Sequence, residues 1–144
     1  TSIWKPLELF SKAGIAAFNA QYTDRAAVRY WSLTGRSDFK LGGSECKPDE
    51  SVPFVEKWKL EADPVDALLF ASEAYLDGGL GQPDANDGLV RVKDARWGTF
   101  LGCVPADHLD EVGQLFGDSP GIGNQFKHKE LYVELVKYLR AQGF

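Results

Sequence analysis

Two short segments rich in β-branched, aromatic and aliphatic residues most strongly constrain what this chain can fold into. Residues 27–33 predict a strand that ends in a turn at Thr34-Gly35. Residues 99–104 predict a second, buried strand, and the proline that follows would end it. The rest of the chain is predicted to form helices and loops around these two strands.

Three further segments have the period of amphipathic helices. Apolar residues recur at three- and four-residue steps over residues 1–22, which predicts one or two helices, with Ser11 as the N-cap of the second. Residues 64–76 and 127–142 show the same period. Glycines and prolines interrupt the excursion 35–64, and loops of that length tend to be functional or mobile.

The loops around the second strand carry the two side chains that best suit catalysis. Asp87 lies in a tight Asn-Asp-Gly turn before this strand, and His108 follows it, 21 residues further along the chain. Strand, Asp loop, strand, His loop is the order in which α/β-hydrolases bring acid and base to one edge of a parallel sheet. A carboxylate bound to one imidazole nitrogen leaves the other free to take a serine proton. An ordinary surface turn would explain Asp87 as well.

Asp110 suggests a different kind of site. It lies two residues beyond His108, where it cannot easily share the same hydrogen bond, and Glu111 and Gln114 add more oxygen atoms to the same turn. Carboxylate and carbonyl oxygens are the ligands that Ca²⁺ prefers. A solvated helix start with favourable acidic residues is the plainer interpretation.

Composition excludes several classes of protein. The 144 residues fit one domain, and 44% hydrophobic residues suffice for a packed core. With 16 basic against 21 acidic residues and no basic run, a nucleic-acid partner is not expected. The longest apolar run, residues 67–71, is too short to span a bilayer, and the first residues lack the pattern of a signal peptide. The absence of Met, also at the start, hints at a processed piece of a longer protein.

Two cysteines and one serine were further candidates for chemistry. Cys46 and Cys103 lack the clustered spacing of a zinc site and could form a disulfide in a secreted protein or remain buried thiols. Ser44 lies in Gly-Gly-Ser-Glu-Cys, which fails the Gly-x-Ser-x-Gly pattern of a nucleophile elbow, so we interpret it as a loop serine.

Several of these motifs together resemble the C-terminal part of the bacterial true lipases of the Pseudomonas and Burkholderia type. The likeness covers most of the chain and is most specific in Asn-Asp-Gly-Leu-Val and His-Leu-Asp-Glu-Val. The segments that carry it are residues 13–22, 28–32, 63–70, 86–90 and 108–114.

The resemblance implies a fold, an activity and a metal. The fold would be α/β, with residues 1–144 as the C-terminal part of a single α/β-hydrolase domain: its last parallel strands, flanking helices and a long excursion before the triad acid. The protein would be a secreted triacylglycerol lipase with a structural Ca²⁺ ion. Implied roles are triad acid for Asp87, triad base for His108, carboxylate ligands of Ca²⁺ for Asp63 and Asp110, and carbonyl ligands for Gln114 and Asp118.

The departures from the family also carry expectations. Its Gly-x-Ser-x-Gly nucleophile, its oxyanion-hole His-Gly pair and its lid are absent, and acid and base alone give little catalysis. We therefore expect the C-terminal piece of a lipase nicked near the lid and still bound to an N-terminal fragment that carries the serine. The family's cysteine pair is also absent, which makes dependence on its dedicated foldase doubtful.

Two alternatives from other classes remain open at this stage. A non-catalytic, calcium-stabilised binding or structural module would use Asp63 and Asp110, and it predicts that His108 does not approach Asp87. A thiol enzyme would pair Cys103 with His108, although a cysteine on a buried strand is usually inert. Asp63 also has a plain interpretation as the N-cap of the helix that follows it. Carboxylesterases, phospholipases and polyester depolymerases would share the same loops.

Overall fold

A parallel pair of strands lies at the centre of the protein. The computed structural model describes residues 11–37, 43–76, 84–113 and 124–144. In these ranges β1 (Trp31–Arg36) runs parallel to β2 (Thr99–Pro105), with Trp31 opposite Thr99 and Arg36 opposite Pro105. One irregularity between Ser32 and Thr34 shifts the register. The carboxyl ends of both strands therefore meet at the same edge.

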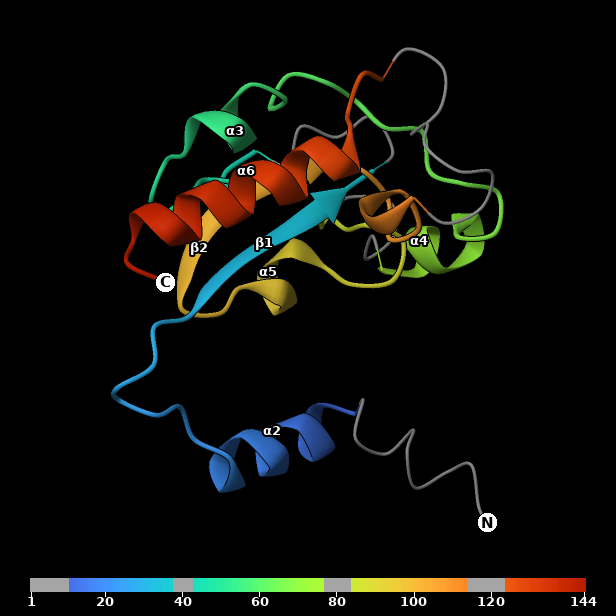
Figure 1. Ribbon diagram of the computed structural model, residues 1–144. Coiled ribbons are helices and arrows are strands. Elements are labelled where there is room, and N and C mark those ends of the chain that lie inside the picture. Colours follow the sequence, from blue (N-terminus) through green and yellow to red (C-terminus); the bar gives the residue numbers. More distant parts are fainter. Residues whose placement is uncertain (1–10, 38–42, 77–83, 114–123) are drawn as a thin grey trace.

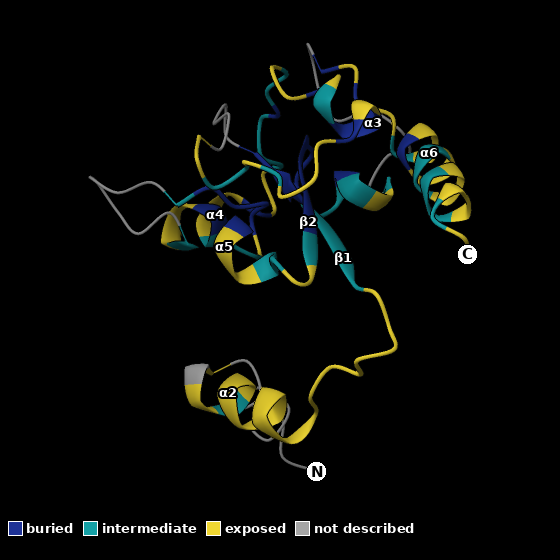
Figure 2. Cartoon of the chain, turned by 90° about the vertical axis from the view of Figure 1, so that its left-hand side faces the viewer, coloured by how far each residue is buried: buried dark blue, intermediate teal, exposed yellow. Residues whose placement is uncertain are grey.

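Helices cover both sides of this strand pair. Figures 1 and 2 agree that α3 and α6 lie on one side of the strands, whereas α4 and α5 lie on the other, and that α2 stands apart from the rest. A 3₁₀ turn, η1, follows β2. The bounds are α2 Lys12–Gln21, α3 Pro53–Glu56, α4 Phe70–Leu76, α5 Val92–Ala95, η1 Asp110–Val112 and α6 His128–Ala141. No described helix is long and apolar enough to cross a bilayer.

The second strand was predicted correctly, and the first was displaced. The strand expected over residues 27–33 begins only at Trp31, and the turn expected at Thr34-Gly35 is wrong because β1 continues to Arg36. Gly35 is buried with its backbone against the carbonyl of Ala106, where a β-carbon would clash. The glycine thus permits a close approach of two backbones and does not make a turn.

The helix predictions had mixed outcomes. Ser11 caps α2 as predicted, since its hydroxyl accepts a hydrogen bond from the Gly14 amide at 3.0 Å. The C-terminal helix, α6, also ends before Gly143 as predicted. The helix expected from residue 64 begins only at Phe70, and Asp63 is not its N-cap. A first helix within residues 1–10 lies outside the described part of the chain.

The buried apolar residues form two clusters, one on each side of the strands. The larger one joins α3, β2 and α6 and contains Val52, Phe54, Val55, Trp58, Leu101, Val104, Ala106, Phe126 and Leu131. The smaller one contains Ala85, Val92, Phe100 and Cys103, with Cys46 packed against it. The smaller cluster thus includes Ala85 and Val92, which flank the turn that carries Asp87.

A disulfide joins Cys46 to Cys103, which settles the choice between a disulfide and buried thiols. It fastens the excursion after β1 to the middle of β2. The thiol-enzyme alternative is therefore wrong, because a cysteine in a disulfide offers no thiolate.

Candidate acid–base pair and carboxylate cluster

Asp87 sits in a hydrogen-bonded loop, which we call the acid loop (residues 85–92). Its Oδ1 accepts hydrogen bonds from the amides of Leu89 at 2.9 Å and Val90 at 2.6 Å. Asn86 adds a further bond, from the Gly88 amide to its side-chain oxygen at 2.8 Å, and Gly88 has a positive φ of 92° that favours glycine. Because two amides hold Oδ1, the second carboxylate oxygen is left to interact outside the loop.

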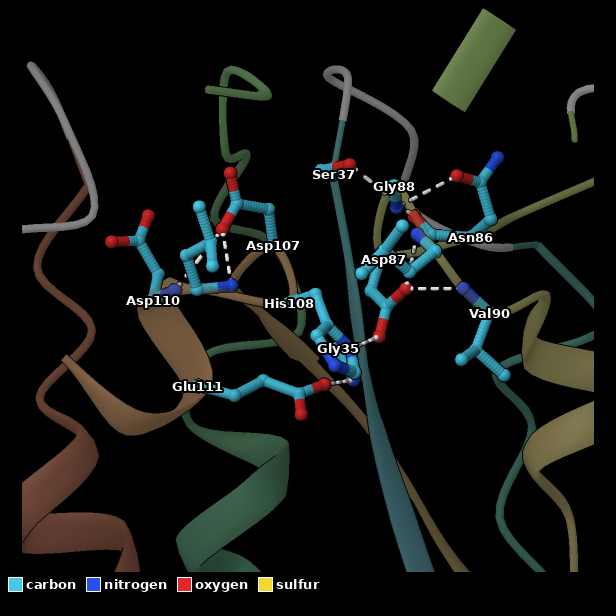
Figure 3. Close-up of polar contacts among 12 residues, drawn as sticks. Gly35, Ser37, Asn86, Asp87, Gly88, Val90, Asp107, His108, Asp110 and Glu111 are labelled. Carbon is cyan, nitrogen blue, oxygen red and sulfur yellow. Dashed lines mark hydrogen bonds and ion pairs between the residues drawn. The ribbon is translucent and has the colours of Figure 1, made fainter. Parts of the chain in front are cut away.

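His108 contacts the second carboxylate oxygen of Asp87. Its Nδ1 lies 2.8 Å from Asp87 Oδ2, and its backbone amide donates to the Asp87 carbonyl at 2.8 Å. Figure 3 shows the ring directed toward Asp87, which is 2% exposed, whereas the His108 side chain is 41% exposed. Among the described residues, Asp87 is the only side chain that hydrogen bonds to this ring. The expectation that both loops open at one edge of the sheet is therefore confirmed.

The charges around His108 favour its protonated form. Burial lowers the pKa of His108, but the hydrogen bond and negative charge of Asp87 and the charges of Glu111 and Asp107 outweigh burial and raise it above its ordinary value. The imidazolium that forms when His108 takes a proton would thus be stabilised by its surroundings.

Glu111 has a structural role that the sequence did not reveal. Its carboxylate accepts a hydrogen bond from the Gly35 amide and so ties the His108 turn to β1. Burial, followed by the charge of Asp87, raises the pKa of Glu111 to about 7. Only the position of Glu111 one helical turn after His108 could have hinted at this contact.

The sequence did not reveal a role for Asp107, although it lies directly before His108. It is fully buried, and its carboxylate accepts from the amides of Leu109 at 2.9 Å, Asp110 at 3.0 Å and Asp66 at 2.8 Å. The bond from the Asp66 amide fastens the chain before α4 to the turn that carries His108. An acidic residue directly before a candidate base was the available signal.

Asp63, Asp107 and Asp110 form a buried group, which we call the carboxylate cluster. One carboxylate oxygen from each lies within 4.8 Å of the others. Burial, and then the charges of Asp110 and Asp107, raise the pKa of Asp63 to about 8. Burial and the charges of Asp107 and Asp66 raise the pKa of Asp110 to about 7. Three carboxylates so close together repel one another unless protons or a cation neutralise them.

The carboxylate cluster fits a hard divalent cation. Asp63 is completely buried, and its Oδ1 accepts from Asn124 at 3.3 Å, whereas its Oδ2 has no hydrogen-bond partner in the described structure. A buried oxygen without a partner is costly, and Ca²⁺ is bound by oxygens of this kind. The structure thus brings Asp63 and Asp110 together as the resemblance implied and adds Asp107. Gln114 and Asp118 lie outside the described residues.

The Asp87–His108 pair and the carboxylate cluster are neighbouring sites whose side chains point in different directions. In Figure 3 the Asp110 carboxylate points away from the His108 ring, which faces Asp87 and Glu111. The first site can hold and transfer a proton, since a buried carboxylate orients an accessible imidazole. The second can hold a cation and join two chain segments. Ser44, rejected as a nucleophile, is exposed in the turn before the disulfide.

Comparisons with known proteins gave no match, so the function of these two sites is argued from their geometry. No protein-family model matches the chain, and neither a curated protein nor a solved structure does.

Proposed function

We propose that Asp87 and His108 are the acid and base of a serine hydrolase that acts on carboxylic esters. The single observation that carries the proposal is the 2.8 Å contact between His108 Nδ1 and Asp87 Oδ2, with the other Asp87 oxygen held by two amides. This is the arrangement in which a buried carboxylate fixes the tautomer and orientation of a catalytic imidazole. The resemblance to bacterial true lipases narrows the proposed substrate to triacylglycerols.

The mechanism assigns each proton to an atom. The Nδ1–H of neutral His108 donates a hydrogen bond to Asp87, so its Nε2 carries no proton and can accept the proton of a serine hydroxyl as that oxygen attacks the ester carbonyl. The imidazolium then gives the Nε2 proton to the departing alcohol, and the same exchange with water releases the acid. Asp87 remains ionised throughout and stabilises the imidazolium.

The nucleophile would come from another segment. No serine, threonine or cysteine in the described ranges hydrogen bonds to the His108 ring. We therefore propose that an N-terminal fragment of the same lipase supplies the serine and the oxyanion donors, and that residues 1–144 are the C-terminal part of an α/β-hydrolase domain. The parallel order of β1 and β2 suits that fold, and a disulfide suits a secreted protein.

A structural Ca²⁺ ion completes the proposal. Asp63 and Asp110 would bind it with Asp107 beside them, and the ion would neutralise the carboxylate cluster. The ion would hold the turn that carries His108 against the chain before α4 and would not polarise the substrate. A non-catalytic, calcium-stabilised module is the second candidate, favoured by the same cluster. That candidate expects His108 to stay away from Asp87, which the 2.8 Å contact opposes.

Two histidines make a matched test possible. His108→Ala should abolish hydrolysis of a short p-nitrophenyl ester by the assembled protein, and Asp87→Ala should lower kcat by a factor on the order of 10⁴. His128→Ala, a change to the histidine at the start of α6, is the control and should leave kcat unchanged. Hydrolysis that survives His108→Ala at the unaltered rate contradicts the proposal.

The two-fragment part of the proposal has its own test. Mass spectrometry of the active material should find a second polypeptide, and a fluorophosphonate probe should label that polypeptide and not the chain of residues 1–144. Ester hydrolysis by material that contains only residues 1–144 would show that the nucleophile lies within this chain.

A further inference from the structure

The segment that carries the disulfide also holds the base of the acid loop. The buried amide of Ala85 donates to Glu45 Oε2 at 2.7 Å, although the two residues are 40 positions apart. Ala85 is also the residue where the loop closes, since the Val92 amide donates to its carbonyl at 2.8 Å. Glu45 therefore contacts the acid loop at the point where both of its ends meet.

Within itself the acid loop is a small rigid unit. The Asp87 amide donates to the Val90 carbonyl at 3.1 Å, and Asn86 and Arg91 form an antiparallel bridge. The two amides on Asp87 Oδ1 complete this set. A shift at Ala85 is thus passed on to the Asp87 carboxylate, because these bonds leave the loop little freedom to absorb it.

Glu45 is itself fixed to β2. Its neighbour Cys46 is joined to Cys103 in the middle of that strand. Three residues later the Asp49 amide donates to the Phe100 carbonyl at 2.8 Å, and the Phe100 amide donates to the Asp49 carboxylate at 3.0 Å. Because β2 also leads directly to His108, the same strand fixes the positions of the Glu45 carboxylate and of the His108 imidazole.

A second anchor comes from β1. The Ser37 amide, directly after β1, donates to the Asn86 carbonyl at 2.9 Å. One anchor lets a rigid loop pivot about it, whereas a second one fixes its orientation. Glu45 and Ser37 hold adjacent residues of the acid loop from two different segments.

We infer that Glu45 is a positioning residue for Asp87, acting through the Ala85 amide to set the contact between Asp87 and His108. This inference rests on the proposed function for its effect on catalysis. The segment that carries Cys46 would then have two roles: its disulfide closes a loop of the chain, and its Glu45 places the triad acid. Glu45 touches neither substrate nor the reacting atoms.

Kinetics of the assembled hydrolase give the first measurement. Glu45→Ala should lower kcat about tenfold with KM unchanged, since a shift well below 1 Å in an orienting group costs this much. Glu45→Gln should restore most of the rate, because its amide oxygen can still accept from Ala85. Glu50→Ala is the control: that glutamate, in the same segment, accepts a hydrogen bond from the Tyr138 hydroxyl at 2.8 Å and is predicted to have no effect.

NMR of the protein gives a second measurement that needs no ester hydrolysis. The low-field proton resonance of His108 Nδ1–H reports its hydrogen bond to Asp87. Glu45→Ala should weaken or broaden this resonance and speed exchange of the Ala85 and Val92 amides, whereas Glu45→Gln should preserve both. If Glu45→Ala does not fold, Glu45→Asp replaces it, because the shorter side chain draws the acceptor back from Ala85.

The outcomes separate the two proposals. An unchanged resonance and unchanged amide exchange in Glu45→Ala, or in Glu45→Asp where that variant replaces it, overturn the positioning role. A weakened resonance that Glu45→Gln restores supports it, even if His108→Ala leaves ester hydrolysis intact and so removes the proposed function. A loss of kcat in Glu45→Ala that Glu45→Gln does not restore, with the resonance unaltered, also counts against positioning.

Discussion

At the scale of single residues, the acidic side chains near His108 differ by the hydrogen-bond donors that each one meets. Asp87 meets two amides and the imidazole, and Asp107 meets three amides. Asp63 keeps one oxygen without any partner in the described structure. For the first two, these hydrogen bonds replace those that water would make to the carboxylate oxygens. Asp63 instead requires a proton or a cation.

Asp107 provides a test at this scale. Asp107→Ala leaves three amides without their acceptor, and it also removes a charge that repels Asp63 and Asp110. The loss of hydrogen bonds to these amides should destabilise the protein more than the loss of charge repulsion stabilises it. We therefore expect the free energy of unfolding to fall by about 2 kcal/mol in the absence of Ca²⁺. Urea unfolding measures it. Asp94→Ala, at a half-exposed side chain paired with Arg91, should change stability by less than about 0.5 kcal/mol. An equal, small effect of both variants contradicts the role given to Asp107.

At the scale of elements, tertiary contacts overrode one local pattern. The period of residues 64–76 predicted a single helix, yet α4 begins only at Phe70. Residues 67–69 form a turn instead, in which the Leu69 amide donates to the Asp66 carbonyl at 2.8 Å, and the Asp66 amide donates to the carboxylate of Asp107, 41 residues further along the chain. The period of apolar residues within a segment cannot show that a carboxylate from a distant segment holds the start of that segment.

The disulfide is the second test, at the scale of elements. It links residues 57 positions apart, and the chain-entropy model gives such a loop about 4 kcal/mol of stabilisation. Reduction with dithiothreitol, or Cys46→Ala with Cys103→Ala, should lower the urea midpoint by the corresponding amount. The oxidised protein at the same pH is the control. A midpoint that is the same before and after reduction would falsify this expectation.

At the scale of the whole molecule, pH and Ca²⁺ should control stability together. The folded pKa values of Asp63, about 8, and Asp110, about 7, exceed that of an ordinary aspartate. As pH rises from about 4, the unfolded chain releases these protons first, so it becomes favoured relative to the folded state. The raised pKa of His108 acts in the same direction, because its contribution is lost as pH rises through the folded pKa.

Thermal unfolding in the presence of EGTA should therefore show a melting temperature that falls between pH 5 and pH 8. Ca²⁺ at one hundred times its Kd should stabilise the protein by about 2.7 kcal/mol at pH 8 and reduce this dependence on pH. Asp110→Asn should remove the effect of Ca²⁺, whereas Asp94→Asn should keep it. A melting temperature at pH 8 that does not respond to Ca²⁺ argues against a cation in the carboxylate cluster.

Features that depend on local chemistry could be predicted from the amino-acid sequence. The apolar run of residues 99–104 predicted β2, and the helical period of residues 127–142 predicted α6. The hydroxyl of Ser11 predicted a helix start, and the Asn-Asp-Gly turn predicted a loop that holds Asp87. Chain order also placed Asp87 and His108 at one edge of a sheet, because parallel strands bring their carboxyl ends together.

The contacts between groups far apart in the sequence could not be predicted in this way. The extension of β1 through Gly35, the choice of a disulfide over thiols, and the contact of Glu45 with Ala85 each join residues 40 or more positions apart. Asp63 changed from a candidate N-cap to a buried carboxylate for the same reason. Local pattern depends on neighbours along the chain, whereas burial and hydrogen-bond partners depend on which segments pack together.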